Sequence, residues 1–139
     1  MASVKGVNFT KRTAEPVEKV IASQSHGRLR VQYDSYEASS LASGSDISVA
    51  KLPAGAIVYD IVVQFDALGS ATIAVGDSAD ADRYITATSV SSAGQMSMSQ
   101  EGAIDGFRYE NTAETDILLT TGSAAISGTV KCAVFYSMD

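Results

Sequence analysis

The sequence has no Trp, one Cys and one His among 139 residues, and these shortages exclude several kinds of site. Cys132 has no partner for a disulfide within the chain, and one Cys with one His cannot supply the ligands of a structural zinc site. Only two Pro residues occur and 45% of the residues are hydrophobic, which argues against a disordered chain. No run of about 20 apolar residues is present, so the sequence predicts no membrane span.

Acidic residues outnumber basic ones, and the two signs are unevenly distributed. The chain carries 16 Asp and Glu against 10 Lys and Arg. A surplus of acids argues against a nucleic-acid-binding protein, because neutralising phosphates requires a surplus of cations. Residues 1–30 nevertheless hold six basic and two acidic side chains, a balance of +4, while the remaining residues have a balance of −10. This pattern predicts a basic arm on an acidic body, and the arm could bind nucleic acid, an anionic surface or the body of a neighbouring copy.

The first 26 residues show no clear hydrophobic period. Residues 14–22 could form one or two helical turns, with Pro16 near the first turn, and an extended arm is the alternative. From Gly27 onward the pattern changes to short β runs. We therefore expect residues 1–26 to form an N-terminal arm and residues 27–139 to form the body.

The body reads as short alternating segments separated by turn residues. Leu29, Val31 and Tyr33 alternate with polar side chains and predict a half-buried strand. In the clearest strand, Ile57 to Phe65, the odd-numbered side chains are predicted to face the core and the even-numbered ones a mixed outer face. Further strands are expected at residues 47–51, 71–75, 84–90, 94–99, 107–109, 117–121 and 126–136. This spacing indicates an all-β fold, an antiparallel β-sandwich of jelly-roll-like architecture with an extended N-terminal arm.

Residue types that carry catalysis are scarce. Gly76-Asp77-Ser78 could present a nucleophilic Ser, but His26 is the only histidine available as a base, and no Gly-x-Ser-x-Gly elbow is present. A turn is the favoured interpretation of these three residues. Cys132 alternates with Val130 and Val134, as a small buried hydrophobic residue does. We therefore predict no enzyme, no catalytic residues and no cofactor.

A cluster of acids follows the same turn. Asp77, Asp80 and Asp82 lie within six residues and could offer carboxylates to a calcium ion. Their spacing does not match an EF-hand loop, and Arg83 comes directly after them as a partner for one of the acids. A solvated acidic loop is the favoured interpretation, an ion site is the alternative, and no metal site is predicted.

Several segments of the chain, taken in order, carry a resemblance to a known family. The segment Lys5-Gly6-Val7-Asn8-Phe9-Thr10-Lys11 is similar to the opening of many small virion structural proteins of tailed bacteriophages. So is Gly27-Arg28-Leu29-Arg30-Val31, followed by Asp34-Ser35-Tyr36-Glu37-Ala38. The strongest part is Lys51-Leu52-Pro53-Ala54-Gly55-Ala56, followed by Asp60, by Phe65-Asp66-Ala67-Leu68-Gly69, and by Val75-Gly76-Asp77 with Asp80, Asp82, Arg83 and Tyr84. The resemblance covers roughly residues 5–90.

The resemblance implies a capsid decoration, or cement, protein that clamps neighbouring major capsid subunits and stabilises the head. Its implied partners are the major capsid protein and other copies of itself, often as a homotrimer, with neither nucleic acid nor membrane. Its implied location is the capsid surface of the virion, after assembly in the host cytoplasm. The capsid contacts that we expect are all in the arm: Lys5, Asn8, Phe9, Lys11, Arg12 and Lys19.

Two alternatives stay open at this point. The resemblance does not separate head from tail placement, so a tail, neck or head-fibre component of the virion is the first alternative. A carbohydrate-binding β-sandwich module is the second. Such modules usually present exposed aromatic platforms, and the absence of Trp counts against that alternative.

Overall fold

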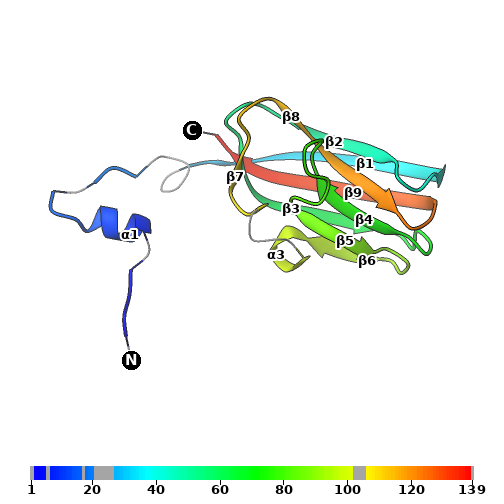
Figure 1. Cartoon of the computed structure of the whole chain (residues 1–139), viewed down its shortest axis with the longest axis horizontal. Helices are drawn as coiled ribbons and strands as arrows, with labels where there is room; N and C mark the ends of the chain where they lie inside the picture. The colour runs from blue at the N-terminus through cyan, green and yellow to red at the C-terminus, as the bar shows by residue number, and fades with distance from the viewer. Residues whose placement is uncertain (1, 6, 17, 21–26, 102–105, 139) are drawn as a thin grey trace.

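The computed structural model describes residues 2–5, 7–16, 18–20, 27–101 and 106–138, most of which form a β-sandwich (Figure 1). Nine strands are present in these ranges: β1 (Leu29–Leu41), β2 (Asp46–Leu52), β3 (Ile57–Phe65), β4 (Thr72–Gly76), β5 (Ile85–Ser89), β6 (Gly94–Ser97), β7 (Tyr109–Glu110), β8 (Thr115–Gly122) and β9 (Ile126–Ser137). Two short helices, α1 (Val7–Arg12) and α3 (Met98–Glu101), accompany them. No helix in the described ranges is long and apolar enough to cross a membrane.

The strands form two sheets in the order of a jelly roll. In the first sheet, here called sheet A, the order is β1-β9-β3-β6, and the two-residue strand β7 pairs with β3. In the second, sheet B, the order is β2-β8-β4-β5. Every pairing is antiparallel. With β7 set aside, the strands of each sheet follow one another as in the two interlocked Greek keys of a jelly roll. The predicted fold class is confirmed.

The hydrophobic core fills the space between the two sheets. Burying one Val, Ile or Leu side chain contributes about 1.5–3 kcal/mol, so the alternating residues of both inner faces provide most of the stability. Sheet A contributes Val58, Ile61, Val63, Val130, Cys132, Val134 and Tyr136, and sheet B contributes Ile47, Val49, Leu52, Ile73, Val75, Ile85, Ile117 and Leu119. The face predicted for β9 is therefore confirmed, with Cys132 buried between Val130 and Val134.

The prediction that odd-numbered residues of β3 face the core is confirmed by the burial of Ile57, Ile61 and Val63. It is wrong at Val58 and Tyr59, because the strand contains a β-bulge there. Val58 lies opposite Tyr136, and Asp60 lies opposite Phe135, so Tyr59 is an extra residue on β3. The alternation restarts after the bulge. Val58 is fully buried in the core, whereas Tyr59 is half-buried and packs edge-on against Phe107 at 6.1 Å between ring centroids.

The prediction of a half-buried strand at the start of β1 is also wrong. Leu29, Val31 and Tyr33 lie on the outer face of sheet A and are 61%, 56% and 61% exposed. Their partners across the ladder, Ser137, Phe135 and Ala133, alternate with the core residues of β9. The apolar side of β1 thus points away from the core, and no other element in the described ranges covers it.

Two helical segments differ from the sequence-based expectation. Helix α1 occupies Val7–Arg12, while the described residues of the expected helical stretch, 14–16 and 18–20, are not helical. The amide of Glu18 donates to the carbonyl of Lys11 at 3.0 Å, which satisfies one carbonyl at the end of α1. Pro16 has no amide proton to extend the helix further. The strand expected at residues 94–99 ends at Ser97 and continues as α3.

Candidate functional site

The N-terminal segment, of which residues 2–5, 7–16 and 18–20 are described, lies beyond the end of the sandwich where β1 begins (Figure 1). Because β9 runs antiparallel to β1, with Ser137 opposite Leu29, the C-terminal end of β9 lies at that same end. Val4 and Val7 are 89% and 76% exposed. The segment therefore presents apolar side chains to its surroundings rather than to its own sandwich.

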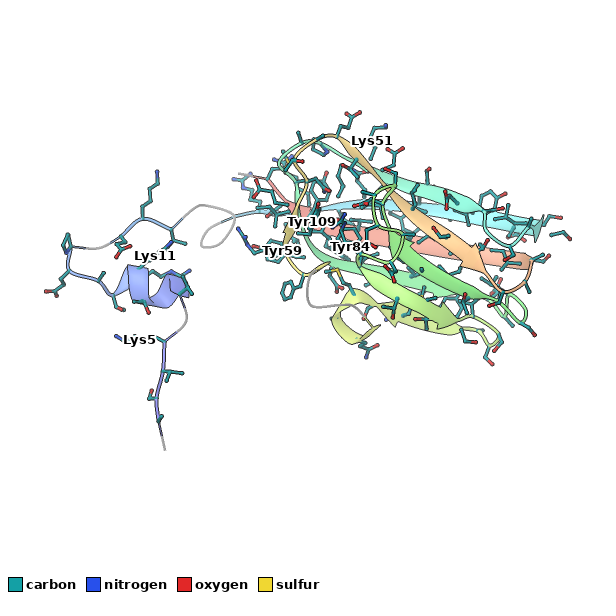
Figure 2. The ribbon with its side chains drawn as sticks, in the orientation of Figure 1. Lys5, Lys11, Lys51, Tyr59, Tyr84 and Tyr109 are labelled. Carbon is teal, nitrogen blue, oxygen red and sulfur yellow. The ribbon has the colours of Figure 1, made fainter. Side chains whose placement is uncertain are left out.

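Four of the expected capsid contacts are basic side chains spread along this segment. Lys5 precedes α1 and donates to the hydroxyl of Thr13 at 3.5 Å (Figure 2). Lys11 and Arg12 form the last turn of α1, where positive charge stabilises the helix dipole. Lys19 is exposed beyond the helix. The structure thus places Lys11 and Arg12 in α1, Lys5 just before the helix with a hydrogen bond to Thr13, and Lys19 beyond the helix.

The two remaining expected contacts, Asn8 and Phe9, lie in α1, but their side chains are outside the part of the chain that is described. His26, the one base that a catalytic Ser78 could use, lies outside the described residues as well. Ser78 itself is exposed in the loop after β4.

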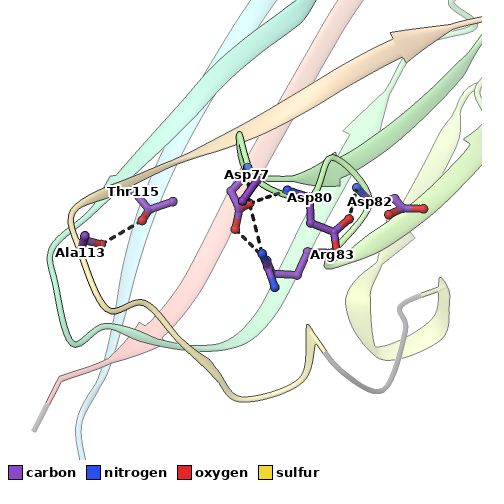
Figure 3. A network of polar contacts seen from close by, with 7 residues as sticks. Asp77, Asp80, Asp82, Arg83, Ala113 and Thr115 are labelled. Carbon is purple, nitrogen blue, oxygen red and sulfur yellow. Dashed lines mark hydrogen bonds and ion pairs between the residues drawn. The ribbon is translucent and has the colours of Figure 1, made fainter.

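The acids that could have formed a calcium site are arranged around an ion pair (Figure 3). Asp77 is buried, and its Oδ2 accepts from Nε of Arg83 at 2.7 Å. Its Oδ1 accepts from the backbone amides of Ala79 and Asp80 at 3.0 and 2.9 Å. The prediction that Arg83 pairs with one of the acids is confirmed.

These contacts use the carboxylate of Asp77 to close the loop between β4 and β5. The guanidinium of Arg83 also lies 4.0 Å from the centroid of the Tyr109 ring, a cation–π contact that ties the loop to β7. The hydrogen bond that Arg83 donates to Asp77 raises the pKa of Arg83. Asp80 and Asp82 remain exposed. A side-chain hydrogen bond with Asp80, together with repulsion between the two carboxylates, raises the pKa of Asp82. Within the described ranges, no group of three His, Cys, Asp or Glu side chains is placed to hold a metal ion.

Tyr84 and Asn111 lie beside this ion pair in the interior. Burial raises the pKa of Tyr84 well above its ordinary value, so its phenol stays protonated. The Tyr84 hydroxyl and the Asn111 side-chain nitrogen are both buried without a hydrogen-bond partner among the described residues.

The outer face of sheet A is divided into an apolar half and a polar half. Near the N-terminal segment, one row across β1, β9 and β3 contains Val31, Phe135 and Asp60, and the next contains Tyr33, Ala133 and Val62, so this half is apolar except for Asp60. At the far end the same strands present polar residues, which are Ser35, Glu37, Thr129, Lys131 and Gln64. The sequence predicts β1 as a strand, but its position at a sheet edge depends on pairing with residues about a hundred positions away.

Two open grooves lie on the described part of the surface. One of about 430 Å³ runs between β1 and β2 and is lined by Gln32, Tyr33, Asp34, Asp116 and residues 48–51. Another, of about 330 Å³, lies on the polar half of the outer face and is lined by residues that include Gln64, Asp66 and Lys131. Such surfaces suit contact with another chain better than capture of a small molecule.

No family model matches the sequence, and no curated protein matches it. Solved structures give clear similarities. A chain in the cyanophage Pam1 capsid asymmetric unit aligns with a TM-score of 0.65 and 25% sequence identity, over 81% of this chain and 86% of that chain.

Two further solved structures are similar in fold. A chain in the capsid of Ralstonia phage GP4 aligns with a TM-score of 0.63 and 16% identity, over 83% of this chain and 86% of that one. A chain in the acidic stable capsid structure of Helicobacter pylori bacteriophage KHP30 aligns with a TM-score of 0.59 and 13% identity, over 79% and 87%. The sandwich is thus an architecture that also occurs in the capsids of three bacteriophages.

Proposed function

We propose that the protein is a bacteriophage virion structural protein and, more specifically, a capsid decoration protein that clamps neighbouring major capsid subunits and stabilises the head. The observation that carries this proposal is the likeness to a chain of the cyanophage Pam1 capsid over 81% of this chain at 25% identity. The likenesses to two other phage capsid structures point the same way. They also support a structural role over a catalytic one.

The N-terminal segment is the part of the molecule best suited to bind a capsid subunit. Helix α1 has six residues, and isolated helices of this length are not stable in water. Docking on a partner supplies the missing stability, because it would bury exposed side chains such as Val4 and Val7. The basic side chains of the segment then provide charge contacts with acidic groups of the capsid.

Two effects produce the clamping: preferential binding to the assembled shell, and the presence of several N-terminal segments in one oligomer. A protein that binds the assembled shell but not separate subunits stabilises the shell by the free energy of that binding. Copies joined in a closed homo-oligomer, with the homotrimer as the form that the resemblance implies, present several N-terminal segments at once. Linking these segments raises the overall affinity without any new kind of contact.

The experiment adds the purified protein to capsid shells assembled without it and measures how many copies remain bound per shell after sedimentation. We compare the full chain with a variant that starts at Gly27. A second variant keeps the segment but replaces Lys5, Lys11, Arg12 and Lys19 with Gln, and Lys131→Gln on the exposed outer face of the sandwich is its matched control.

The proposal predicts that the full chain and Lys131→Gln saturate the shell. The truncated and fourfold variants bind at least about tenfold more weakly, while their far-UV circular dichroism still shows a folded sandwich. Equal occupancy by the truncated variant would refute the role given to the segment. Failure of the full chain to bind any shell would refute the decoration function itself.

A further inference from the structure

Strand β1 is a long sheet edge whose first ten residues, Leu29–Ala38, pair regularly with β9, and its β-bulge is confined to the far end between Ala38 and Leu41. It spans 13 residues at the end of sheet A, and among the described residues its one ladder partner is β9. Natural edge strands are commonly blocked by Lys, Pro or short length, and β1 contains neither Lys nor Pro. Its outer face instead exposes Leu29, Val31 and Tyr33. Such an edge is suited to accept a further strand by main-chain hydrogen bonding.

The sequence of β1 is complementary to itself in the antiparallel direction. When two copies are placed with Gln32 opposite Gln32, Val31 of one strand lies opposite Tyr33 of the other. Arg30 then lies opposite Asp34. The two-fold symmetry produces each pair twice. A β-branched residue beside an aromatic one and an Arg beside an Asp are both favourable cross-strand pairs.

The side chains involved are available for these contacts. Arg30 and Asp34 are both exposed. Among the described residues the Arg30 side chain has no hydrogen bond or ion pair, and one oxygen of Asp34 accepts only from the neighbouring amide of Ser35 at 2.8 Å. Moving the two-fold axis by two residues, from Gln32 to Asp34, shifts the register by four residues and places Asp34 opposite itself, which brings like charges together. The Gln32 register avoids that repulsion.

The groove between β1 and β2 has room for the inward side chains of an added strand. It has a volume of about 430 Å³, and Asp34 and Asp116 are among its lining residues. The side chain of Gln32 spans this groove and bonds both the carbonyl and the amide of Lys51, at 2.8 and 3.0 Å. Arg30 of an incoming β1 projects to the same side as Asp34, which has no ion pair among the described residues, whereas Asp116 already pairs with Lys51 at 3.1 Å. The charge complementarity therefore lies between Arg30 and Asp34.

We propose that β1 is a self-association surface whose occupant is β1 of a second copy of this chain. The two strands pair antiparallel about a two-fold axis at Gln32 and join two A sheets into one continuous sheet. This contact is independent of the proposed decoration function. It also differs from a three-fold contact, so it joins either two single chains or two closed oligomers.

The experiment is a charge-swap cycle read by sedimentation velocity. The variants are Arg30→Asp, Asp34→Arg and the double variant Arg30→Asp/Asp34→Arg. Lys131→Asp is the control, since it makes the same change of charge on the outer face of β9. Val31→Lys tests the apolar pair, with Ser39→Lys as a matched control further along β1.

Each single swap places like charges opposite each other twice, and is expected to raise the dissociation constant at least about tenfold. At a protein concentration equal to the original dissociation constant, the average mass should then fall close to that of the single chain. The double variant restores the original mass, because the two charges have only exchanged strands. Val31→Lys also dissociates the pair, while Lys131→Asp and Ser39→Lys leave it unchanged. Circular dichroism of every variant shows the sandwich intact.

Three results would overturn the proposal. One is a wild-type mass that none of the β1 variants alters. Another is a double variant that remains dissociated while folded. The third is rescue of Asp34→Arg by Arg28→Asp instead of Arg30→Asp, which would place the axis at Val31 and contradict the Gln32 register. Shell binding by a variant that cannot self-associate would leave the decoration function standing, so the two proposals fail separately.

Discussion

The ion pair between Asp77 and Arg83 gives a quantitative prediction about what holds the β4–β5 loop. The side chains of Asp77 and Arg83 are 5% and 18% exposed, so solvent screens their 2.7 Å contact little. Asp77→Asn keeps an oxygen for the amides of Ala79 and Asp80 but removes the charge. Charge-assisted hydrogen bonds contribute about 1.5–3 kcal/mol, so we expect this variant to lose about 2 kcal/mol of unfolding free energy.

The partner substitution, Arg83→Met, keeps an apolar stem against Tyr109 but removes the cation. It leaves the buried Asp77 carboxylate without its charge partner and abolishes the cation–π contact, so we expect a loss of about 3 kcal/mol. The double variant removes both charges together. We expect a loss of about 3 kcal/mol for it, which gives a coupling energy of about 2 kcal/mol between the two sites.

The assay is urea denaturation followed by far-UV circular dichroism and by Tyr fluorescence, since the chain contains no Trp. The slope of the unfolding free energy against urea concentration should be the same for the four proteins, so that their unfolding midpoints can be compared directly. Losses in the two single variants that add up in the double variant to within about 0.5 kcal/mol would refute the coupling. The loop would then be held by its backbone turns and not by the ion pair.

Two further predictions concern the interior. Gly76→Ala places a Cβ 2.1 Å from the carbonyl oxygen of Asp80, so it should destabilise the fold by about 3 kcal/mol in the same urea assay. Gly94→Ala, whose Cβ meets nothing closer than 3.9 Å, should cost less than about 1 kcal/mol, and equal losses would contradict the packing argument. Burial raises the pKa of the Cys132 thiol from its ordinary 9.0 to about 12, so the folded chain holds this proton more tightly than the unfolded chain does. This contribution to the free energy of unfolding is complete below about pH 9 and is lost between about pH 9 and 12. The free energy of unfolding of Cys132→Ala should therefore fall less steeply over this pH range than that of the unsubstituted chain, and an equal fall would contradict the prediction.

Much of the sandwich follows from alternation, because the pleat of a strand places every second side chain on the core side. Cys132 and its neighbours in β9 are an example, and the structure confirms the face predicted for them. Alternation alone does not predict the bulge in β3. Ile57, Val58 and Tyr59 are all apolar, so the pattern fits either face, and only the pairing with β9 shows that Tyr59 is the extra residue.

The exposure of one side of β1 is a second feature that the sequence does not predict. Leu29, Val31 and Tyr33 alternate as a buried strand does, yet their exposure depends on β1 being at a sheet edge and on pairing with residues as distant as Phe135. Neither is encoded locally. Short-range chemistry was easier to predict, since Arg83 lies only six positions from its partner Asp77.

The contacts expected from the N-terminal segment stay predictions. Lys5, Lys11 and Arg12 do lie together around α1, although the sequence placed a possible helix later in the chain. A six-residue helix carries too weak a periodic signal to be located by pattern alone, and its stability depends on a partner that the sequence does not contain.

The most direct test of the decoration function is the number and position of copies on purified virions, measured by quantitative gel densitometry and immunogold labelling. A decoration protein repeats with the capsid lattice, so the account predicts label over the whole head and a copy number that is a simple fraction of that of the major capsid protein. Label confined to the neck or tail with only a few copies, or no label on virions at all, would contradict it.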